Sequence, residues 1–402
     1  MNAVGIDVSK GKSTVAVIQP FGVVIAEPFD VFHTDQDLQE LVAFLKTLSG
    51  ETKVVMEYTG TYYEPIANAL HNAGIFVSVV NPLLIDDYDT NRVRKVKTDK
   101  IDALKIASFA LDKWLKLREY TPASTIRKTL KVLNRQYIKL NKMLVMQKNN
   151  FIALLDCCFP CANKLFASPR RESDGHEKWV DFVLKFPHVN SVAKLSLSAF
   201  QSKFQSWCRK NHYKYSESKA VEIHSYARSQ ISTLPMTESV KTIIVESAKL
   251  LISTLEALAK MRSEMDELAS QLPEYDTVMG IYGVGKVFCA QLIAEIGDVE
   301  QLKSGKSLVA LAGIDPPPNQ SGSNDPKSRS ISKRGSPELR KTLFQIMTVY
   351  IVKCPADEPV YQFLDKKRSE GKPYKVYMIA AAHKFLRIYF ARLREALHTQ
   401  RA

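Results

Sequence analysis

The sequence lacks a long apolar run, a cysteine framework and any low-complexity tract in its 402 residues. A membrane-spanning helix needs about 20 consecutive apolar residues, so the absence of such a run argues against an integral membrane protein. Six cysteines without a regular spacing do not suit a disulfide-bonded secreted protein. The chain also begins directly with an apolar strand pattern and shows no signal peptide. We therefore expect a globular protein of a reducing cytoplasm.

Acidic residues are fewer than basic ones: 42 Asp and Glu stand against 56 Lys and Arg, which gives a net charge of +14. An excess of this size is typical of proteins that bind a polyanion such as nucleic acid. Four of the acids are expected to share one site, as argued next, so the remaining surface is more basic than the total suggests.

Four carboxylates in the first hundred residues form the main chemical pattern. Asp7 and Glu57 each end a short apolar run that reads as a buried strand. Asp99 and Asp102 lie three residues apart at the start of a helical pattern, which places both on one helix face. Each acid alone would be read as a solvated strand end or a helix N-terminal charge. Together they predict a site for Mg²⁺ or Mn²⁺, which prefer carboxylate oxygens and share phosphate ligands with a substrate.

Strands and helices alternate in the first 110 residues. We expect strands at 4–8, 13–18, 23–29, 53–57 and 76–80, and helices at 35–48 and 62–73. Three hairpin strands followed by helix, strand, helix and strand is the order of the ribonuclease H fold. In that fold the first and fourth strands are neighbours, which would bring Asp7 and Glu57 together.

The middle of the chain is helical and basic. A charged stretch precedes the acid pair, and a long amphipathic helix follows over about 127–155; we expect nucleic-acid contacts from Arg92, Arg94, Lys95, Lys97, Arg127, Lys128, Lys131 and Arg135. A second long helix over about 236–272 favours a helical hairpin or coiled coil with the first.

Residues 156–235 predict a small helical insert with an aromatic core. Cys158 with Cys161 and Cys208 with His212 have spacings that a structural zinc site uses, but the interval between the pairs is long. Buried free thiols are the preferred interpretation.

The C-terminal part contains two further motifs. The turn Gly283-Val284-Gly285-Lys286 lies between two short helical patterns, as in a helix-hairpin-helix, and would expose backbone N–H groups to a phosphate. A serine-rich loop follows and leads into a helix that starts at Pro337. Such a composition is typical of a disordered surface loop, but Lys333 and Arg334 of the loop and Arg340 of the helix would provide a phosphate-binding field. A serine in this loop becomes a nucleophile if its proton is removed and the developing charge is stabilised.

These motifs together resemble the insertion-sequence-110 family of transposases and the related pilin-gene invertases. The resemblance rests on G-I-D-V-S-K, M-E-Y-T-G and K-T-D-K-I-D-A in the first part, and on I-Y-G-V-G-K, A-E-I-G-D, L-A-G-I-D-P, Q-S-G and I-S-K-R-G-S-P-E-L-R in the last. It covers residues 1–155 and about 236–395, and is weak over 156–235.

The resemblance implies a RuvC-like N-terminal domain with an acidic DEDD site formed by Asp7, Glu57, Asp99 and Asp102. It implies a C-terminal serine that forms a 5′-phosphoserine link with DNA, which we assign to Ser321, with Ser323 and Ser332 as alternatives. Partners implied are donor and target DNA, a structured bridge RNA that chooses both sites by base pairing, and further copies of the chain, as dimers that form a synaptic tetramer. The expected location is the bacterial cytoplasm, at the nucleoid.

The predicted architecture is therefore an α/β ribonuclease H-like domain at 1–110, a helical or coiled-coil region at 111–275 with the insert, and a mainly α transposase domain at 276–402. The leading function is RNA-guided DNA recombination with Mg²⁺ or Mn²⁺. Two alternatives stay open: a metal-dependent endonuclease or junction resolvase that uses water as the nucleophile, and an inactive nucleic-acid-binding protein.

Overall fold

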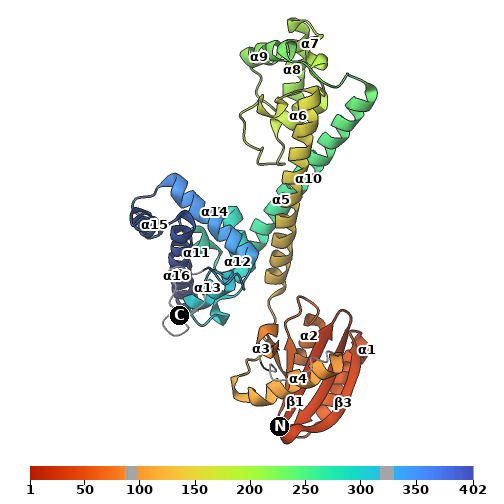
Figure 1. The fold of residues 1–402 in the computed structure, drawn as a ribbon, viewed down its shortest axis with the longest axis vertical. Coiled ribbons are helices and arrows are strands. Elements are labelled where there is room, and N and C mark those ends of the chain that lie inside the picture. Colours follow the sequence, from red (N-terminus) through yellow and green to blue (C-terminus); the bar gives the residue numbers. More distant parts are fainter. Residues whose placement is uncertain (87, 89–97, 317–329, 402) are drawn as a thin grey trace. The chain divides into compact units, whose positions relative to one another are not determined.

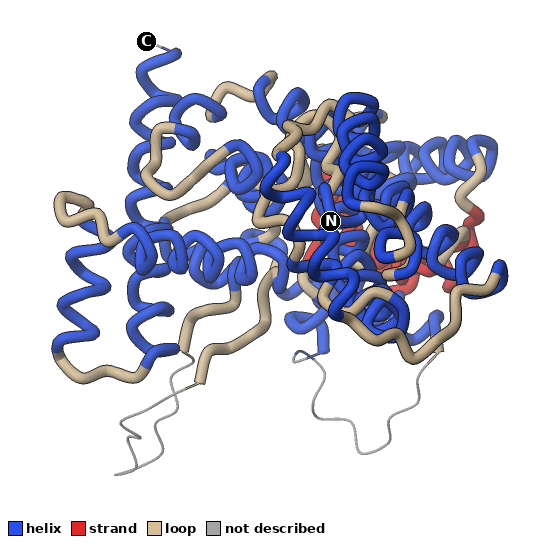
Figure 2. Tube along the Cα trace, turned by 90° about the horizontal axis from the view of Figure 1, so that it is seen from above, coloured by secondary structure: helices blue, strands red, loops and turns tan. Residues whose placement is uncertain are grey.

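The structure, a computed structural model, describes residues 1–86, 88, 98–316 and 330–401. It divides into two compact units, Met1–Pro122 and Ala123–Ala402. Within the described residues, strands occur only in the first unit, as Figure 2 shows in red. The domain boundaries predicted near 110 and 275 stay predictions.

The first unit is built on a five-stranded sheet (Figure 1). Its elements are β1 (Asn2–Ser9), β2 (Lys12–Gln19), β3 (Val23–Phe32), α1 (Asp35–Thr47), β4 (Thr52–Glu57), α2 (Glu64–Asn72), β5 (Phe76–Val80), α3 (Pro82–Asp86) and α4 (Asp99–Asp112). The strand order is β3-β2-β1-β4-β5. Strands β1, β2 and β3 pair antiparallel, and β4 and β5 join them parallel to β1. This order and these directions confirm the ribonuclease H-like fold.

Both faces of the sheet are covered, which explains why the central strands are continuous apolar runs. On one face, leucines of α1 and α2 such as Leu41 and Leu70 pack with Val4 and Ile6. On the other face, Ile106 and its neighbours on α4 pack with Ala3 and Val55. Strand β1 is therefore held rigidly in the middle of the unit.

The second unit is helical. Its helices are α5 (Thr125–Cys158), α6 (Lys178–Lys185), α7 (Asn190–Ala193), α8 (Leu197–Lys210), α9 (Glu217–Ser229), α10 (Glu238–Ser270), α11 (Tyr275–Met279), α12 (Lys286–Ile296), α13 (Gly305–Ala312), α14 (Pro337–Lys353), α15 (Pro359–Ser369) and α16 (Tyr374–Arg401). Helices α5 and α10 pack side by side and run in opposite directions (Figure 1). The predicted hairpin of two long helices is thus confirmed.

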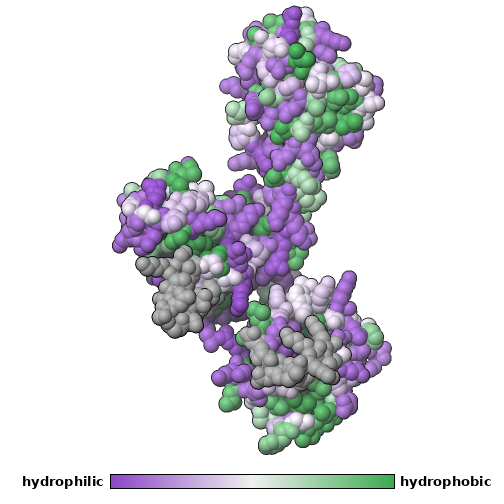
Figure 3. Space-filling view, in the orientation of Figure 1, coloured by the Kyte–Doolittle hydropathy of each residue, from purple (hydrophilic) through white to green (hydrophobic). Residues whose placement is uncertain are grey.

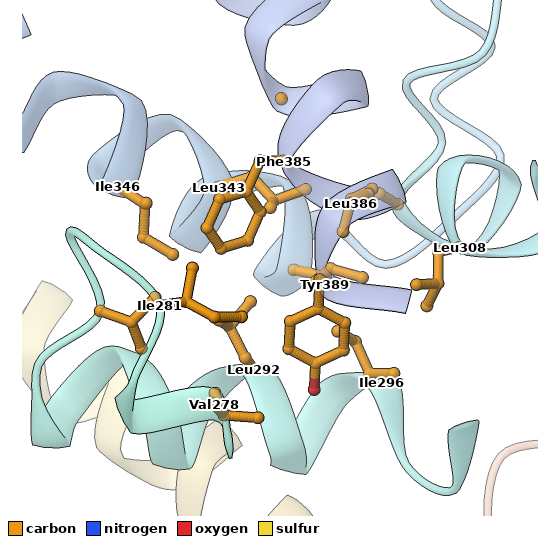
Figure 4. Close-up of a cluster of buried hydrophobic side chains, with 14 of the residues drawn as sticks. Val278, Ile281, Leu292, Ile296, Leu308, Leu343, Ile346, Phe385, Leu386 and Tyr389 are labelled. Atoms are coloured by element: carbon orange, nitrogen blue, oxygen red, sulfur yellow. The ribbon is translucent and has the colours of Figure 1, made fainter. Parts of the chain in front are cut away.

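Two hydrophobic cores stabilise this unit. One joins Leu144 and Phe151 of α5 to Leu251 of α10 and to the aromatic side chains of residues 156–235. The other gathers the C-terminal helices; in Figure 4, Phe385 and Tyr389 of α16 lie among Leu292 of α12 and Leu343 of α14. Between the two cores, the face of α5 and α10 seen in Figure 3 is mostly hydrophilic. Among the helices of the described residues, none is both long and apolar enough to cross a membrane.

Candidate active site

Asp7 and Glu57 are brought together by the pairing of two parallel strands. Ile6 is the register partner of Met56 in the β1–β4 pair, so the next residues, Asp7 and Glu57, lie side by side at the carboxyl ends of both strands. Both side chains are half-buried. The sequence-predicted adjacency of these two acids is present.

Helix α4 brings the second pair of acids to the same strand. Its N-terminus is fixed by Thr98, whose hydroxyl accepts a hydrogen bond from the backbone N–H of Ile101 at 3.3 Å. The helix lies so close to β1 that a Cβ on Gly5 would meet the carbonyl oxygen of Ala103 at 2.1 Å. Because Gly5 and Asp7 point to the same face of the sheet, Asp102, which precedes Ala103, lies on the face that carries Asp7. Asp99 is one turn earlier and exposed.

The charges of this cluster affect the pKa of Glu57. Burial, followed by the negative charges of Asp7, Asp86 and Asp102, raises the pKa of Glu57 to about 7, while Lys105 opposes the shift. A carboxylate at neutral pH is therefore costly here unless a cation is added. This repulsion means that the carboxylates of Asp7, Asp86 and Asp102 lie close enough to Glu57 to raise its pKa.

The donor set fits a divalent cation. Nowhere in the described residues do three or more His, Cys, Asp or Glu side chains form a ready-made metal cage. Mg²⁺ needs no such cage, because it binds through one or two carboxylates and completes its shell with water and phosphate. Asp7 with Glu57 supplies such a pair, and Asp102 and Asp99 lie on the helix packed against the same strand.

Asp86 was missed by the sequence prediction. It ends α3, which follows β5, and β5 is parallel to β4. Carboxyl ends of parallel strands meet at one edge of a sheet, so an acid shortly after β5 falls near an acid that ends β4. That rule was available from the sequence and identifies Asp86 as a fifth acid of the site. Lys105, one turn after Asp102 on α4, was missed as well.

The residues that flank the C-terminal serine segment, 311–315 and 332–336, are joined by backbone hydrogen bonds. We call these paired residues the stem of the serine segment. Ser321 and Ser323 lie outside the described residues, whereas the residues on both sides are placed. The backbone N–H groups of Ser332, Lys333 and Ser336 donate to the carbonyls of Asp315, Gly313 and Leu311 at 2.8, 3.0 and 2.7 Å. Ser332 also donates its hydroxyl to Asp315 at 2.6 Å.

Two glycines explain why this stem can form. A Cβ on Gly335 would meet the carbonyl oxygen of Leu311 at 2.2 Å, and a Cβ on Gly313 would meet the nitrogen of Gly335 at 2.5 Å. Gly313 also has a φ of +60°, which favours glycine. Beyond the stem, Ser336 caps α14 and donates to the buried carboxylate of Glu295 at 2.9 Å. The segment that contains Ser321 is thus anchored at both ends.

The turn before α12 has the geometry predicted for a helix-hairpin-helix. Gly283 has a φ of +79°, and a Cβ there would lie 3.1 Å from the ring of Tyr350. Gly285 is the N-cap of α12 and has no side chain to satisfy the first N–H groups of that helix. Lys286 is exposed and pairs with Asp266 at 3.2 Å.

Comparisons with known proteins match both ends of the chain. A family described as a DEDD transposase of IS110 type matches residues 4–160, which include all four predicted acids. A second family, described as "Transposase IS116/IS110/IS902 family", matches residues 275–362. The chain belongs to the IS110 family of transposases.

Two curated relatives extend over most of the transposase, and a third over about half of it. A pilin gene-inverting protein of Moraxella bovis is 23% identical over 90% of this chain and 87% of its own length. A protein of the same name from Moraxella lacunata is 23% identical over 85% of this chain and 80% of its own. An uncharacterised 42 kDa protein of insertion element IS900 from Mycobacterium paratuberculosis is 23% identical over 49% of each chain.

Two solved structures of Thermus thermophilus RuvC also align with part of the transposase. One is in complex with a Holliday junction substrate; it is 14% identical, with a TM-score of 0.24, and covers 29% of this chain and 96% of that one. The other is 15% identical, with a TM-score of 0.23, and covers 30% of this chain and all of that one.

The predicted nucleic-acid contacts of the transposase have different surroundings. Arg92, Arg94, Lys95 and Lys97 lie outside the described residues. Arg127 forms a bidentate ion pair with Glu274, whose side chain is 3% exposed. Its guanidinium also donates a hydrogen bond to the carbonyl oxygen of Gly297 at 3.2 Å. Its guanidinium holds α5 to the C-terminal core, so we leave Arg127 out of the proposed nucleic-acid surface.

The other predicted cations remain candidates. Arg135 is exposed and 3.7 Å from the buried Glu295, and Lys128 and Lys131 are half-buried on the same helix. Lys333 and Arg334 are exposed beside the serine stem. Arg340 is half-buried and donates to the carbonyl of Ala312 at 2.9 Å.

The insert forms an aromatic core. Phe182, Phe200, Phe204 and Trp207 are buried against one another, which confirms core packing for these side chains. Cys158 and Cys208 are buried in the same core as free thiols, and Cys161 and His212 lie in left-handed turns. No grouping of these four side chains in the described structure is suited to hold a metal ion.

Proposed function

We propose that this transposase exchanges DNA strands through a serine nucleophile and an acidic metal site, guided by a bridge RNA. The parallel β1–β4 register that sets Asp7 beside Glu57, with α4 carrying Asp99 and Asp102 against the same strand, is the observation that supports it most. Mg²⁺ or Mn²⁺ bound by these carboxylates would neutralise charge on the scissile phosphate.

The chain's own residues carry the remaining steps of the proposal. The Ser321 hydroxyl attacks the scissile phosphorus, its proton leaves to solvent or to a carboxylate, and the 3′ oxygen of the DNA departs as a hydroxyl. The product is a 5′-phosphoserine link. The 3′ hydroxyl of the other DNA then attacks this phosphorus and releases the serine. Lys333 and Arg334, exposed on the stem of the serine segment, would bind the phosphate oxygens.

The net charge of +14 supports polyanionic partners. On this proposal, α5 and the turn at Gly283–Lys286 bind DNA and RNA through backbone contacts, while base pairing selects the sequence. The proposed active assembly is a tetramer, formed by two dimers on DNA at the bacterial nucleoid. Purifying the chain with its bound RNA and sequencing that RNA tests guidance: an RNA complementary to the element's ends supports it, and random cellular RNA contradicts it.

The covalent step is tested by trapping. The full chain with its RNA is incubated with end-labelled DNA and Mg²⁺, and a protein–DNA adduct is sought on a denaturing gel. Ser321→Ala is expected to abolish the adduct, whereas the matched control Ser332→Ala, whose hydroxyl is held by Asp315, retains it. Cleavage that persists in Ser321→Ala without an adduct would instead identify water as the nucleophile.

The acidic site is tested in the same assay. Asp7→Ala or Asp102→Ala is expected to abolish strand exchange and adduct formation while RNA binding changes little, because the acids are proposed to bind metal and not RNA. Equal losses of RNA binding and strand exchange would contradict the assigned role. An equivalent substitution of the exposed Glu27 on β3 serves as the control.

A further inference from the structure

A cavity of about 790 Å³ lies beside the stem of the serine segment. Its walls come from α14, from the first half of α16 and from the two chain segments that flank residues 317–329. Pro316 and Ser330, the last described residues on either side of Ser321, both line it. A volume of this size is within the range of pockets that bind one small ligand, roughly 300–1,000 Å³.

The walls of this cavity are mainly apolar, and the charged side chains that line it are all cationic. Ile331, Phe344 and Ile379 contribute apolar surface, and the cations that line it are Lys333, Arg340, Lys341 and Lys375. No carboxylate of the described residues lines the cavity. Lys341 and Lys375 are exposed, and neither forms an ion pair within the described part of the chain. Such a lining favours a ligand with a flat apolar body and a negative charge.

Two rings are available to such a ligand. Phe344 of α14 and His383 of α16 are both half-buried in the wall. His383 donates its Nε2–H to the carbonyl oxygen of Ile314 at 3.0 Å, which fixes the imidazole against the start of the serine segment. Burial, with the charge of Arg387, lowers the pKa of His383, although the bond to Ile314 and the charge of Asp315 act in the opposite direction. A neutral ring of this kind can lie against a base.

We propose that this cavity binds one unpaired nucleotide of the DNA strand, with the base between the apolar walls and its phosphate at Lys341 and Lys375. The proposal rests on the proposed function, because it concerns the DNA on which the serine segment acts. Extruding one nucleotide exposes the neighbouring phosphodiester, and a pocket that takes the base offsets part of the unstacking cost. Phosphate binding alone would need the cations but not the apolar walls.

The experiment compares two ligands and three proteins. A labelled DNA duplex carries either one bulged adenosine or, at the same place, one bulged abasic site. Affinities are measured by fluorescence anisotropy for the full chain, purified free of nucleic acid, in EDTA at physiological salt, since salt weakens phosphate contacts. The variant Ala380→Trp fills the cavity from α16, and Ala391→Trp places the same side chain on the exposed surface of the same helix.

The unmodified chain is expected to bind the bulged adenosine about tenfold more tightly than the abasic bulge. Ala391→Trp should retain this preference, and Ala380→Trp should bind both duplexes equally. Equal binding of both duplexes by the unmodified chain overturns the proposal without any variant, and so does a preference that survives in Ala380→Trp. The assay measures equilibrium binding and requires no strand cleavage, so its result is independent of whether Ser321 forms an adduct.

Discussion

Glu57→Gln is expected to raise the free energy of unfolding of the first unit and to abolish strand exchange. The glutamine keeps the shape of the side chain but removes a charge that Asp7, Asp86 and Asp102 oppose. The pKa of Glu57 rises from 4.5 to about 7, a difference of 7 − 4.5 = 2.5. At about 1.4 kcal/mol for each pH unit, the full shift would correspond to roughly 3.5 kcal/mol. Because the side chain is only half-buried, solvent screening reduces this to on the order of 1–2 kcal/mol.

The sign follows from the protons bound in each state. Between pH 4.5 and about 7 the folded protein holds a proton on Glu57 that the unfolded chain has lost. The free energy of unfolding therefore falls as pH rises through this window and levels off above it. At pH 4, where Glu57 is mostly protonated in both the folded and the unfolded chain, the wild type and Glu57→Gln should be nearly equal in stability. At pH 8 the variant should be more stable by the screened amount.

Hydrogen exchange measured by mass spectrometry on peptides that cover β1 and β4 reports this difference for the first unit alone. It is measured in EDTA, with Glu27→Gln as the control, since Glu27 is exposed on β3. Adding Mg²⁺ should stabilise the wild type more than Glu57→Gln, because a ligand stabilises the state that binds it. A variant that is less stable than wild type at both pH values, or a difference independent of pH, would refute the reasoning.

Three further sets of substitutions test packing in the first unit and buried ion pairs in the second. Gly5→Ala forces a Cβ to within 2.1 Å of the Ala103 carbonyl, so we expect the first unit to lose about 1–3 kcal/mol or more in a denaturant titration; wild-type stability would contradict the close packing of α4. Arg127→Met leaves Glu274 buried without its cation and should cost about 3–5 kcal/mol, most of it recovered in the double variant with Glu274→Met, as thermal unfolding can measure. His176 bonds Asp181 and Glu256 at 3.0 Å each; desolvation lowers its pKa, but these two bonds outweigh that and raise it. The contribution of protonated His176 to stability is therefore complete below pH 6.5 and is lost as pH rises through the raised pKa. Hydrogen exchange at residues 171–181 should then increase between pH 6 and 8 by more than the intrinsic exchange rate does. The variant His176→Gln should remove this additional pH dependence.

The order of strands in the sequence was sufficient to predict the core of the first unit. Apolar runs ending in Asp7 and Glu57 identify strands buried on both faces, and only a few topologies accommodate three hairpin strands followed by two crossovers. The adjacency of Asp7 and Glu57 then follows from the fold. The approach of α4 does not, because it depends on Gly5, whose missing side chain gives no pattern signal until the contact with Ala103 is seen.

The individual cations were less predictable than the elements that carry them. Arg127 looks like the other cations of α5 in the sequence, but its partner Glu274 belongs to a segment far along the chain. Charge periodicity shows which helix face is basic but not which cation finds a buried partner. The aromatic side chains of the insert were predictable as a core, since rings that recur at helical spacing bury large areas against one another.

The acidic cluster of the first unit and the basic side chains of the second unit are expected to act differently on DNA. The acids around Glu57 repel a polyanion until a divalent cation compensates them, and the raised pKa of Glu57 reflects that excess charge. Cations of the second unit, such as Lys341 and Lys375, attract DNA phosphates without any metal. DNA affinity should therefore reside mainly in the second unit and decline with salt, whereas Mg²⁺ should act mainly on chemistry. On the proposed function, this division explains how an acidic site can work within a basic protein: basic side chains of the second unit bind the DNA, and a bound metal ion would let one phosphate approach the carboxylates.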